Sequence, residues 1–362
     1  MSAQLIGTRI KALREQKNLS QNELARLLGF KDRQTVSAIE TGERRVSAEE
    51  LLLAIEKLGA PLDYFTNPFL LAGEGRFSWR QSGVALPSLE AFERSAGRWI
   101  AAYRTLAPQV GRPAPLLRRT LGLTPRSSFE EAAVAGERFA AEFNLGEMPA
   151  LRLAEVMERE LGILVLMIDA FKGVSGAACR LPALDTVLIN RHEPAGRRHF
   201  DLAHELFHVL TWDMMPPEHF EDATEQSKNR IEQLANSFAS ALLMPAAALD
   251  RFGPWDSEEN GLRARFEWVS KELGATASAL KWRLITFGRL DRRAKDVRVT
   301  PPRRSRLDPI PPLFSKPFVE VIALANKQGL VSVRRAAGLL DMTIEDLKDL
   351  CAAHGVDARK TI

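Results

Sequence analysis

The five residues His204-Glu205-Leu206-Phe207-His208 have the types and spacing that most directly imply chemistry in this chain. Histidines four residues apart lie one above the other on an α-helix, so both imidazoles can reach one metal ion from the same side. A zinc ion lowers the pKa of the water that it binds, and the intervening Glu205 points near enough to take the proton as general base. The motif therefore indicates the core of a zinc hydrolase.

The same short motif also occurs by chance, and both histidines would then be ordinary packing or capping residues of a helix. The flanks favour the metal site, because they are apolar, as expected for a helix buried in a domain core. These flanking residues are Phe200, Leu202, Ala203, Val209 and Leu210, and the helix is closed off by Pro216-Pro217.

A catalytic zinc site needs a third protein ligand, and four residues after the motif are candidates: His219, Glu221, Glu225 and Glu232. Glu232 lies in a stripe with Ala235, Asn236, Ala239 and Leu243, at steps of three and four residues. The alanines would let this second helix approach the first closely. Glu225 lies seven residues earlier on roughly the same stripe, so helical phase favours Glu232 without excluding Glu225.

Two longer strings, Phe200-Asp-Leu-Ala-His-Glu-Leu-Phe-His208 and Glu232-Gln-Leu-Ala-Asn-Ser-Phe-Ala-Ser-Ala-Leu-Leu-Met-Pro245, resemble the ImmA/IrrE-type metallopeptidases. The resemblance spans roughly residues 130 to 290. It implies His204, His208 and Glu232 as metal ligands and Glu205 as the general base. Many relatives have glycine where this chain has Phe207, and the larger side chain would narrow the space beneath the metal.

The first seventy residues have the pattern of a small all-α domain with five helices. Leu5, Ile10 and Leu13 mark the first helix, and Ser20 begins the second with Glu23 completing a capping box. A third helix over Gln34–Thr41 turns Val36 and Ile39 inward. A helix, a glycine-containing turn and a short second helix is the layout that places the second helix in a DNA major groove.

The stretches Leu19-Ser-Gln-Asn-Glu-Leu-Ala25 and Thr35-Val-Ser-Ala-Ile-Glu-Thr-Gly42 are similar to the Xre/lambda-repressor helix-turn-helix family, with one extra residue after Gly29. The resemblance implies double-stranded operator DNA as a partner. It implies these DNA-facing residues: Gln21, Arg33, Gln34, Thr35 and Ser37, with Arg44 and Arg45 near phosphates. Residues 1–67 hold ten basic and nine acidic residues, so dimerisation or protein contact is the alternative use of this module.

The fold class predicted from these patterns is mainly α with a small β-sheet. We expect a lambda-repressor-like helix-turn-helix domain (1–67), a helical connecting region (68–128), a zincin-like α+β metallopeptidase domain (129–294), a Pro- and Arg-rich linker (295–315) and a small helical C-terminal module (316–362). Three strand-like stretches, 163–168, 176–180 and 186–190, indicate a small antiparallel sheet that edges the cleft. Phe77-Ser-Trp-Arg80 is either a strand or a packing anchor, with no chemistry assigned.

Composition narrows the function classes. The chain has 362 residues, 45% of them hydrophobic, with a net charge of +4 that establishes no anionic partner by itself. No apolar run approaches the length that crosses a bilayer, and the N-terminus lacks a secretory pattern, so we expect a cytoplasmic, nucleoid-associated protein without membrane contact. Two distant cysteines, Cys179 and Cys351, do not suggest a disulfide framework.

These observations predict a regulator in which a DNA-binding domain is fused to a zinc-dependent endopeptidase, active as a homodimer on an Xre-type repressor, a toxin-antitoxin partner or its own linker. Manganese fits the same nitrogen and oxygen ligands as zinc. The alternative is a non-catalytic Xre-family transcription factor or antitoxin, whose peptidase-like domain senses a ligand or partner. An intact Glu205 favours the enzyme, because a retired site has no physical need for a general base.

Overall fold

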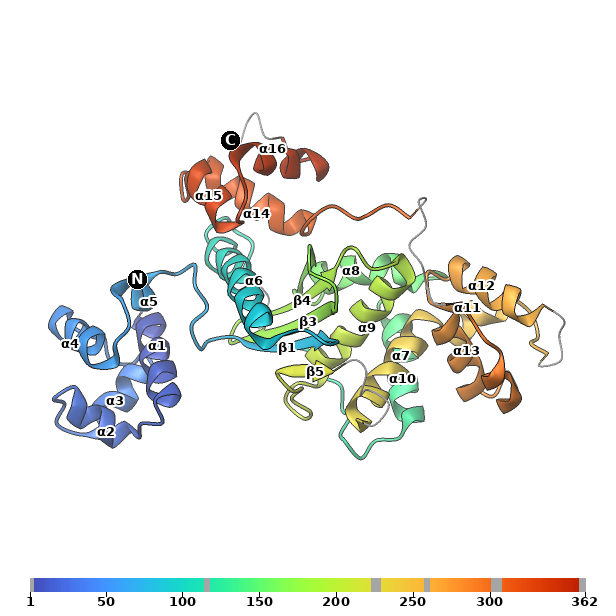
Figure 1. Cartoon of the computed structure of the whole chain (residues 1–362), viewed down its shortest axis with the longest axis horizontal. Coiled ribbons are helices and arrows are strands. Elements are labelled where there is room, and N and C mark those ends of the chain that lie inside the picture. Colours follow the sequence, from blue (N-terminus) through green and yellow to red (C-terminus); the bar gives the residue numbers. More distant parts are fainter. Residues whose placement is uncertain (1–2, 114–117, 223–228, 257–260, 301–307, 358–362) are drawn as a thin grey trace.

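The computed structural model describes residues 3–113, 118–222, 229–256, 261–300 and 308–357. A small helical domain lies at one end of the molecule, a sheet with its covering helices occupies the middle, and a further helical group lies at the other end (Figure 1). The mainly α fold with a small sheet is the predicted class. Among the helices of the described residues, none combines the length and apolar character that a bilayer-spanning segment requires.

The N-terminal domain consists of five helices around its own apolar core: α1 (Ala3–Gln16), α2 (Gln21–Leu27), α3 (Arg33–Glu40), α4 (Ala48–Leu58) and α5 (Leu62–Thr66). The predicted capping box is present, with Ser20 and Glu23 each accepting from the other's backbone N–H. Gly7 lets α1 contact α3, because a Cβ there would lie 1.9 Å from the carbonyl oxygen of Ile39. Val36 and Ile39 are buried, as their spacing predicts.

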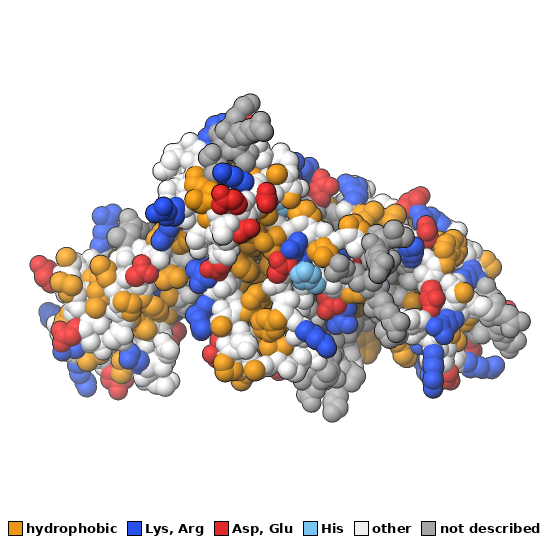
Figure 2. Space-filling model, turned by 45° about the horizontal axis from the view of Figure 1, so that its top comes forward, with side chains coloured by type: hydrophobic (Ala, Val, Ile, Leu, Met, Phe, Trp, Pro, Cys, Tyr) orange, Lys and Arg blue, Asp and Glu red, His pale blue; other side chains and the backbone are white. Residues whose placement is uncertain are grey.

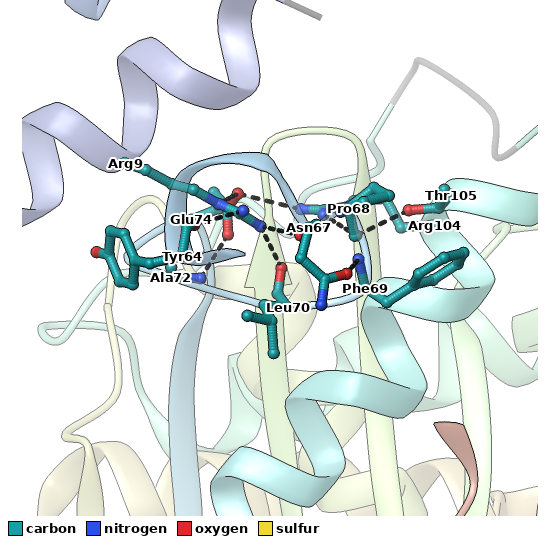
Figure 3. A network of polar contacts seen from close by, with 10 residues as sticks. All are labelled: Arg9, Tyr64, Asn67, Pro68, Phe69, Leu70, Ala72, Glu74, Arg104 and Thr105. Atoms are coloured by element: carbon teal, nitrogen blue, oxygen red, sulfur yellow. Dashed lines mark hydrogen bonds and ion pairs between the residues drawn. The ribbon is translucent and has the colours of Figure 1, made fainter. Parts of the chain in front are cut away.

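A polar network joins this domain to the rest of the chain (Figure 3). The fully buried guanidinium of Arg9 donates to the carbonyl oxygens of Tyr64, Asn67 and Leu70 at 2.6 to 2.8 Å. It also pairs with Glu74, which lies 3.7 Å from Arg104 of α6 (Leu86–Leu106). A buried arginine of α1 therefore fixes the segment between the two parts of the molecule.

The sheet has five strands in the order β2-β4-β3-β1-β5. Their bounds are β1 (Arg76–Gln81), β2 (Leu164–Ile168), β3 (Val174–Leu181), β4 (Leu184–Asn190) and β5 (Phe220–Asp222). The predicted antiparallel arrangement is confirmed for β3 and β4 but is wrong for β2, which pairs with β4 in parallel; of the two further strands, β1 is antiparallel to β3 and β5 is parallel to β1. Strand partners distant in sequence set these directions, and local patterns do not report them.

Both faces of the sheet are buried, and alternate residues of its strands enter two different cores. Val165 and Val187 pack with α9 (Ala195–Thr211), whereas Leu166 and Leu188 pack on the opposite side with α6 and the C-terminal helices. This division follows from the two-residue period of a strand. A sheet covered on both faces gives α9 a rigid support.

Residues 68–128, predicted as a helical connecting region, supply β1 to the sheet and α6 to its far side. The predicted C-terminal module, α14 (Lys316–Lys327), α15 (Val333–Leu339) and α16 (Ile344–Ala353), lies against α6 and shares a core with the sheet (Figure 1). The remaining helices are α7 (Phe129–Glu142), α8 (Pro149–Arg159), α10 (Arg230–Leu243), α11 (Ala246–Asp250), α12 (Leu262–Glu272), α13 (Ala277–Thr286) and the 3-10 helix η1 (Arg292–Asp296). Part of the predicted linker, 301–307, lies outside the described residues.

Candidate metal centre

Helices α9 and α10 pack against each other and carry the side chains of the candidate site. Ala203, Ala235 and Ala239 are fully buried between apolar neighbours, so small side chains allow the close approach that their spacing predicts. Phe207 lies in the same core, with its ring centroid 5.6 Å from that of Phe238 on α10. Phe207 therefore fills the interface between the two helices.

Three side chains converge in this interior. Nε2 of His204 lies 3.0 Å from Oε2 of Glu232, and Nε2 of His208 lies 3.2 Å from Oε1 of the same carboxylate. The two Nε2 atoms are 3.1 Å apart. Within the described residues, this trio is the group of histidine, cysteine and acidic side chains with metal-ligand spacing, its ligand atoms all lying within 4.8 Å of one another.

The other three candidates for the third ligand are not brought to this place by any described contact. His219 is half exposed, and its Nε2 lies 2.7 Å from Oε2 of Glu93. Glu221 belongs to β5, and its side chain is not described; Glu225 lies outside the described residues. Among the candidates whose side chains are described, Glu232 is the one beside the histidines, and helical phase favours the same residue.

Hydrogen bonding orients His204 for metal binding. Its Nδ1 donates to Oδ1 of Asn236 at 3.0 Å, which leaves the lone pair of Nε2 facing His208 and Glu232. Burial, reinforced by the charge of Arg80, lowers the pKa of His204 to about 4, so the ring is neutral at pH 7. Asn236 thus holds the imidazole of His204 in one tautomer, as the outer partner of a metal-binding histidine would.

The charge of the trio fits a divalent cation. Burial by itself opposes ionisation of Glu232, and a positive charge between Glu232 and the two histidines would favour its ionised form. One carboxylate and two imidazoles then direct lone pairs toward a common point. This point is buried, because only 0 to 2% of the surface of each of the three residues is exposed. Such a donor set matches the nitrogen and oxygen ligands of zinc, with manganese as a second fit.

Glu205 lies against strand β3 beside this trio. A Cβ on Gly176 would be 2.8 Å from the carbonyl oxygen of Leu188, so the glycine lets β3 lie close to β4, and the same Cβ would be in ordinary contact with Cγ of Glu205 at 3.8 Å. The carboxylate oxygen Oε1 of Glu205 is buried without a hydrogen-bond partner in the described part of the chain. Burial raises the pKa of Glu205 well above its ordinary value, and the guanidinium of Arg80 partly opposes that rise.

Arg80 and Asp201 belong to the surroundings of the site, although the sequence analysis assigned them no role. Arg80 of β1 pairs in register with Gly176, so its side chain leaves the sheet on the face toward α9, where it forms a buried ion pair with Asp201. Asp201 precedes His204 and Glu205 by three and four residues, which places it on their helical face. The spacing of three and four residues could have identified Asp201 from the sequence. No local pattern could have identified Arg80, which lies 121 residues from Asp201 along the chain.

The five predicted DNA-facing residues and Arg44, predicted to lie near phosphates, differ in how available their side chains are. Arg33 and Gln34 are exposed in the first turn of α3, where Asp32 caps the helix through the N–H of Thr35. Ser37 and Thr35 are partly exposed, and Thr35 also donates to Asp32 at 3.3 Å. Gln21 donates to Glu40 at 3.0 Å, and Arg44 makes two hydrogen bonds with Glu50, at 2.6 and 3.1 Å.

Arg33 and Gln34 are therefore the two predicted contacts with exposed side chains at the start of the candidate recognition helix. On the face of the molecule in Figure 2, basic and acidic side chains are interspersed and do not gather in one patch.

Comparisons with known proteins agree with this arrangement. Residues 10–65 match a family described as Helix-turn-helix, and residues 158–278 match one described as IrrE N-terminal-like domain. The radiation response metalloprotease IrrE of Deinococcus deserti is 39% identical over 80 residues, which are 20% of this chain and 28% of that protein. The chain thus carries an Xre-type helix-turn-helix segment followed by an IrrE-like peptidase domain, as both resemblances imply. Arg80 falls within neither matched segment.

Proposed function

We propose that this chain is a DNA-binding regulator whose IrrE-like domain is a zinc-dependent endopeptidase acting on a repressor-type partner protein. The observation that carries the proposal is the buried convergence of His204, His208 and Glu232 beside the carboxylate of Glu205. The same chain carries the helix-turn-helix segment. A proteolytic site joined to a DNA-reading domain suits the control of genes better than general digestion.

Each side chain has a separate role in this proposal. His204, His208 and Glu232 hold the metal, and Asn236 keeps His204 in the required tautomer. A bound zinc ion supplies Lewis-acid chemistry that activates water and polarises a peptide carbonyl. Glu205 accepts the proton at its carboxylate and returns it to the leaving amine.

Arg80 supports the ionised form of that general base. Its guanidinium is fixed by Asp201 and counteracts the rise in the pKa of Glu205 that burial causes. A base that is too strongly buried would hold its proton at neutral pH, so a nearby fixed cation helps to keep it competent.

The substrate class follows from the fusion. Candidates are an Xre-type repressor encoded nearby, a toxin-antitoxin partner, or the chain's own Pro- and Arg-rich segment, of which residues 301–307 lie outside the described residues. Cleavage of any of these would change transcription at the operator that the helix-turn-helix segment reads. Stress-response and mobile-element genes are the proposed targets of that control.

The test measures bound metal on the purified chain and then incubates it with repressors encoded nearby. We expect stoichiometric zinc, or manganese, and one defined cleavage that is lost in Glu205→Gln but kept in Glu155→Gln, a matched change at an exposed carboxylate of α8. Metal binding without cleavage of any partner, together with unchanged regulation by Glu205→Gln, would instead support the non-catalytic sensor.

A further inference from the structure

Two hollows lie side by side along the outer face of α10. One, of about 490 Å³, lies between α9, α10 and α13, and the other, of about 640 Å³, lies between α7, α10 and α13. Both are lined by the same five residues, Ser237, Ser240, Trp282, Arg283 and Thr286. They are therefore two parts of one groove, called the α10 groove below.

The inner end of the α10 groove reaches the surroundings of the metal centre. It is lined there by Arg80, Asp201 and Asn236, the last of which contacts His204. Glu232, Asn236 and Ser240 follow one another at steps of four residues along α10, so the groove runs outward from a metal ligand. Eight residues of helix span about 12 Å, which corresponds to roughly four residues of extended chain.

The walls of the groove are held together by an internal brace. The guanidinium of Arg283, on α13, is buried and pairs with Glu137 of α7, and its Nε donates to the carbonyl oxygen of Met244 at 3.2 Å. These contacts fix α7, α13 and the C-terminal end of α10 relative to one another around the groove. A preformed groove binds an extended chain with a smaller loss of conformational entropy than a flexible surface does.

The groove combines apolar and basic chemistry. Trp282 is 50% exposed and Val134 is 54% exposed, and both line the groove. Two acidic lining residues, Asp201 and Glu137, are already paired with arginines. The exposed Arg292 and Lys295 line the outer part, where the remaining acidic lining residue is Glu130.

We propose that the α10 groove binds an extended segment of the protein substrate in which apolar residues alternate with acidic ones. Trp282 packs against an apolar side chain of that segment, and Arg292 and Lys295 pair with its carboxylates. The groove then delivers the segment toward Arg80 and the metal centre. This last step rests on the proposed peptidase function, whereas binding in the groove is independent of it.

The test uses full-length protein with Glu205→Gln, so that no peptide is cut, and measures fluorescence anisotropy. The probes are two labelled twelve-residue peptides: one alternates Glu with Leu and Phe, and the other has Lys at every Glu. We expect the acidic peptide to bind at least about tenfold more tightly, with the difference shrinking as salt rises. Trp282→Ala should weaken it by about tenfold.

The chain offers matched controls for both kinds of contact. Trp268 on α12 is 56% exposed and lies outside the groove lining, so Trp268→Ala should leave peptide binding within about twofold. Charge reversal at Arg292 and Lys295 should abolish the preference for the acidic peptide, whereas Arg293→Glu, at an exposed neighbour outside the lining, should preserve it.

Failure takes a distinct form for each proposal. Equal binding of both peptides, no binding of either, or equal losses in Trp268→Ala and Trp282→Ala would overturn the groove. Cleavage of a repressor by wild type that Trp282→Ala leaves unchanged would overturn delivery of the substrate through the groove and keep the peptidase. Selective peptide binding with no cleavage of any repressor by wild type would keep the groove and remove the peptidase.

Discussion

Replacing Asn236 with alanine should lower the zinc affinity of this chain by about 10- to 100-fold while leaving the fold in place. Oδ1 of Asn236 accepts the Nδ1–H of His204 at 3.0 Å, and no other hydrogen bond to that nitrogen is described. The alanine would leave the Nδ1–H of His204 facing the hollow that Asn236 lines, where a water molecule is a less fixed acceptor than the amide oxygen. The ring then loses the contact that keeps its Nε2 lone pair directed at His208 and Glu232.

The expected magnitude corresponds to about 1.4 to 2.7 kcal/mol of binding free energy, which is within the range for one lost outer partner of a metal-bound histidine. Competition with a chromogenic zinc chelator at pH 7.5 measures it directly. Asn236→Asp keeps an acceptor at the same place and should retain most of the affinity. Ser237→Ala, the next residue of α10, serves as the matched control and should bind zinc like wild type.

The result that would refute this reasoning is a zinc affinity of Asn236→Ala within about twofold of wild type. Orientation of His204 would then come from packing alone. Equal loss in Ser237→Ala would show instead that α10 is distorted by any substitution there. Thermal unfolding curves of the three variants without metal distinguish the two cases, because a distorted helix lowers the melting temperature before zinc is added.

Four further outcomes are expected. Chelation of the metal should lower the melting temperature, because the bound ion stabilises only the folded chain, and re-addition of zinc should restore it. Burial raises the pKa of Glu158 from 4.5 to about 7, so the folded chain keeps a proton that the unfolded chain has released. Wild type should therefore lose up to about 3 kcal/mol of unfolding free energy between pH 4.5 and 7, and Glu158→Gln, followed by urea denaturation, should not. Gly136→Ala would place a Cβ 2.4 Å from the carbonyl oxygen of Phe238 and so overpack α7 against α10. The free energy of unfolding should fall by about 1 to 3 kcal/mol in the same urea assay. An unchanged urea midpoint would contradict this packing of the two helices. Alanine at Arg33 and Gln34 should weaken binding to an operator selected from random DNA by about 1 to 3 kcal/mol per base contact at fixed salt, whereas no loss would leave dimerisation as the role of the domain.

The sequence by itself determined the parts of this protein that depend on residues three or four positions apart. The histidine spacing, the phase of Glu232 and the Ser20–Glu23 capping box all lie within single helices or their ends. Such contacts are fixed by the geometry of one helical turn, so a linear pattern reports them. The helix-turn-helix and peptidase resemblances rest on motifs of the same local kind.

Only the tertiary structure decided what surrounds that motif. The direction of each strand pair, the ion pair of Arg80 with Asp201 and the docking of the C-terminal helices on α6 join residues that are distant along the chain. These contacts depend on which apolar faces cover one another, and many partners satisfy a given local pattern equally well. Arg80 shows the consequence, because a residue outside every motif lies close enough to oppose the rise in the pKa of Glu205, the proposed general base.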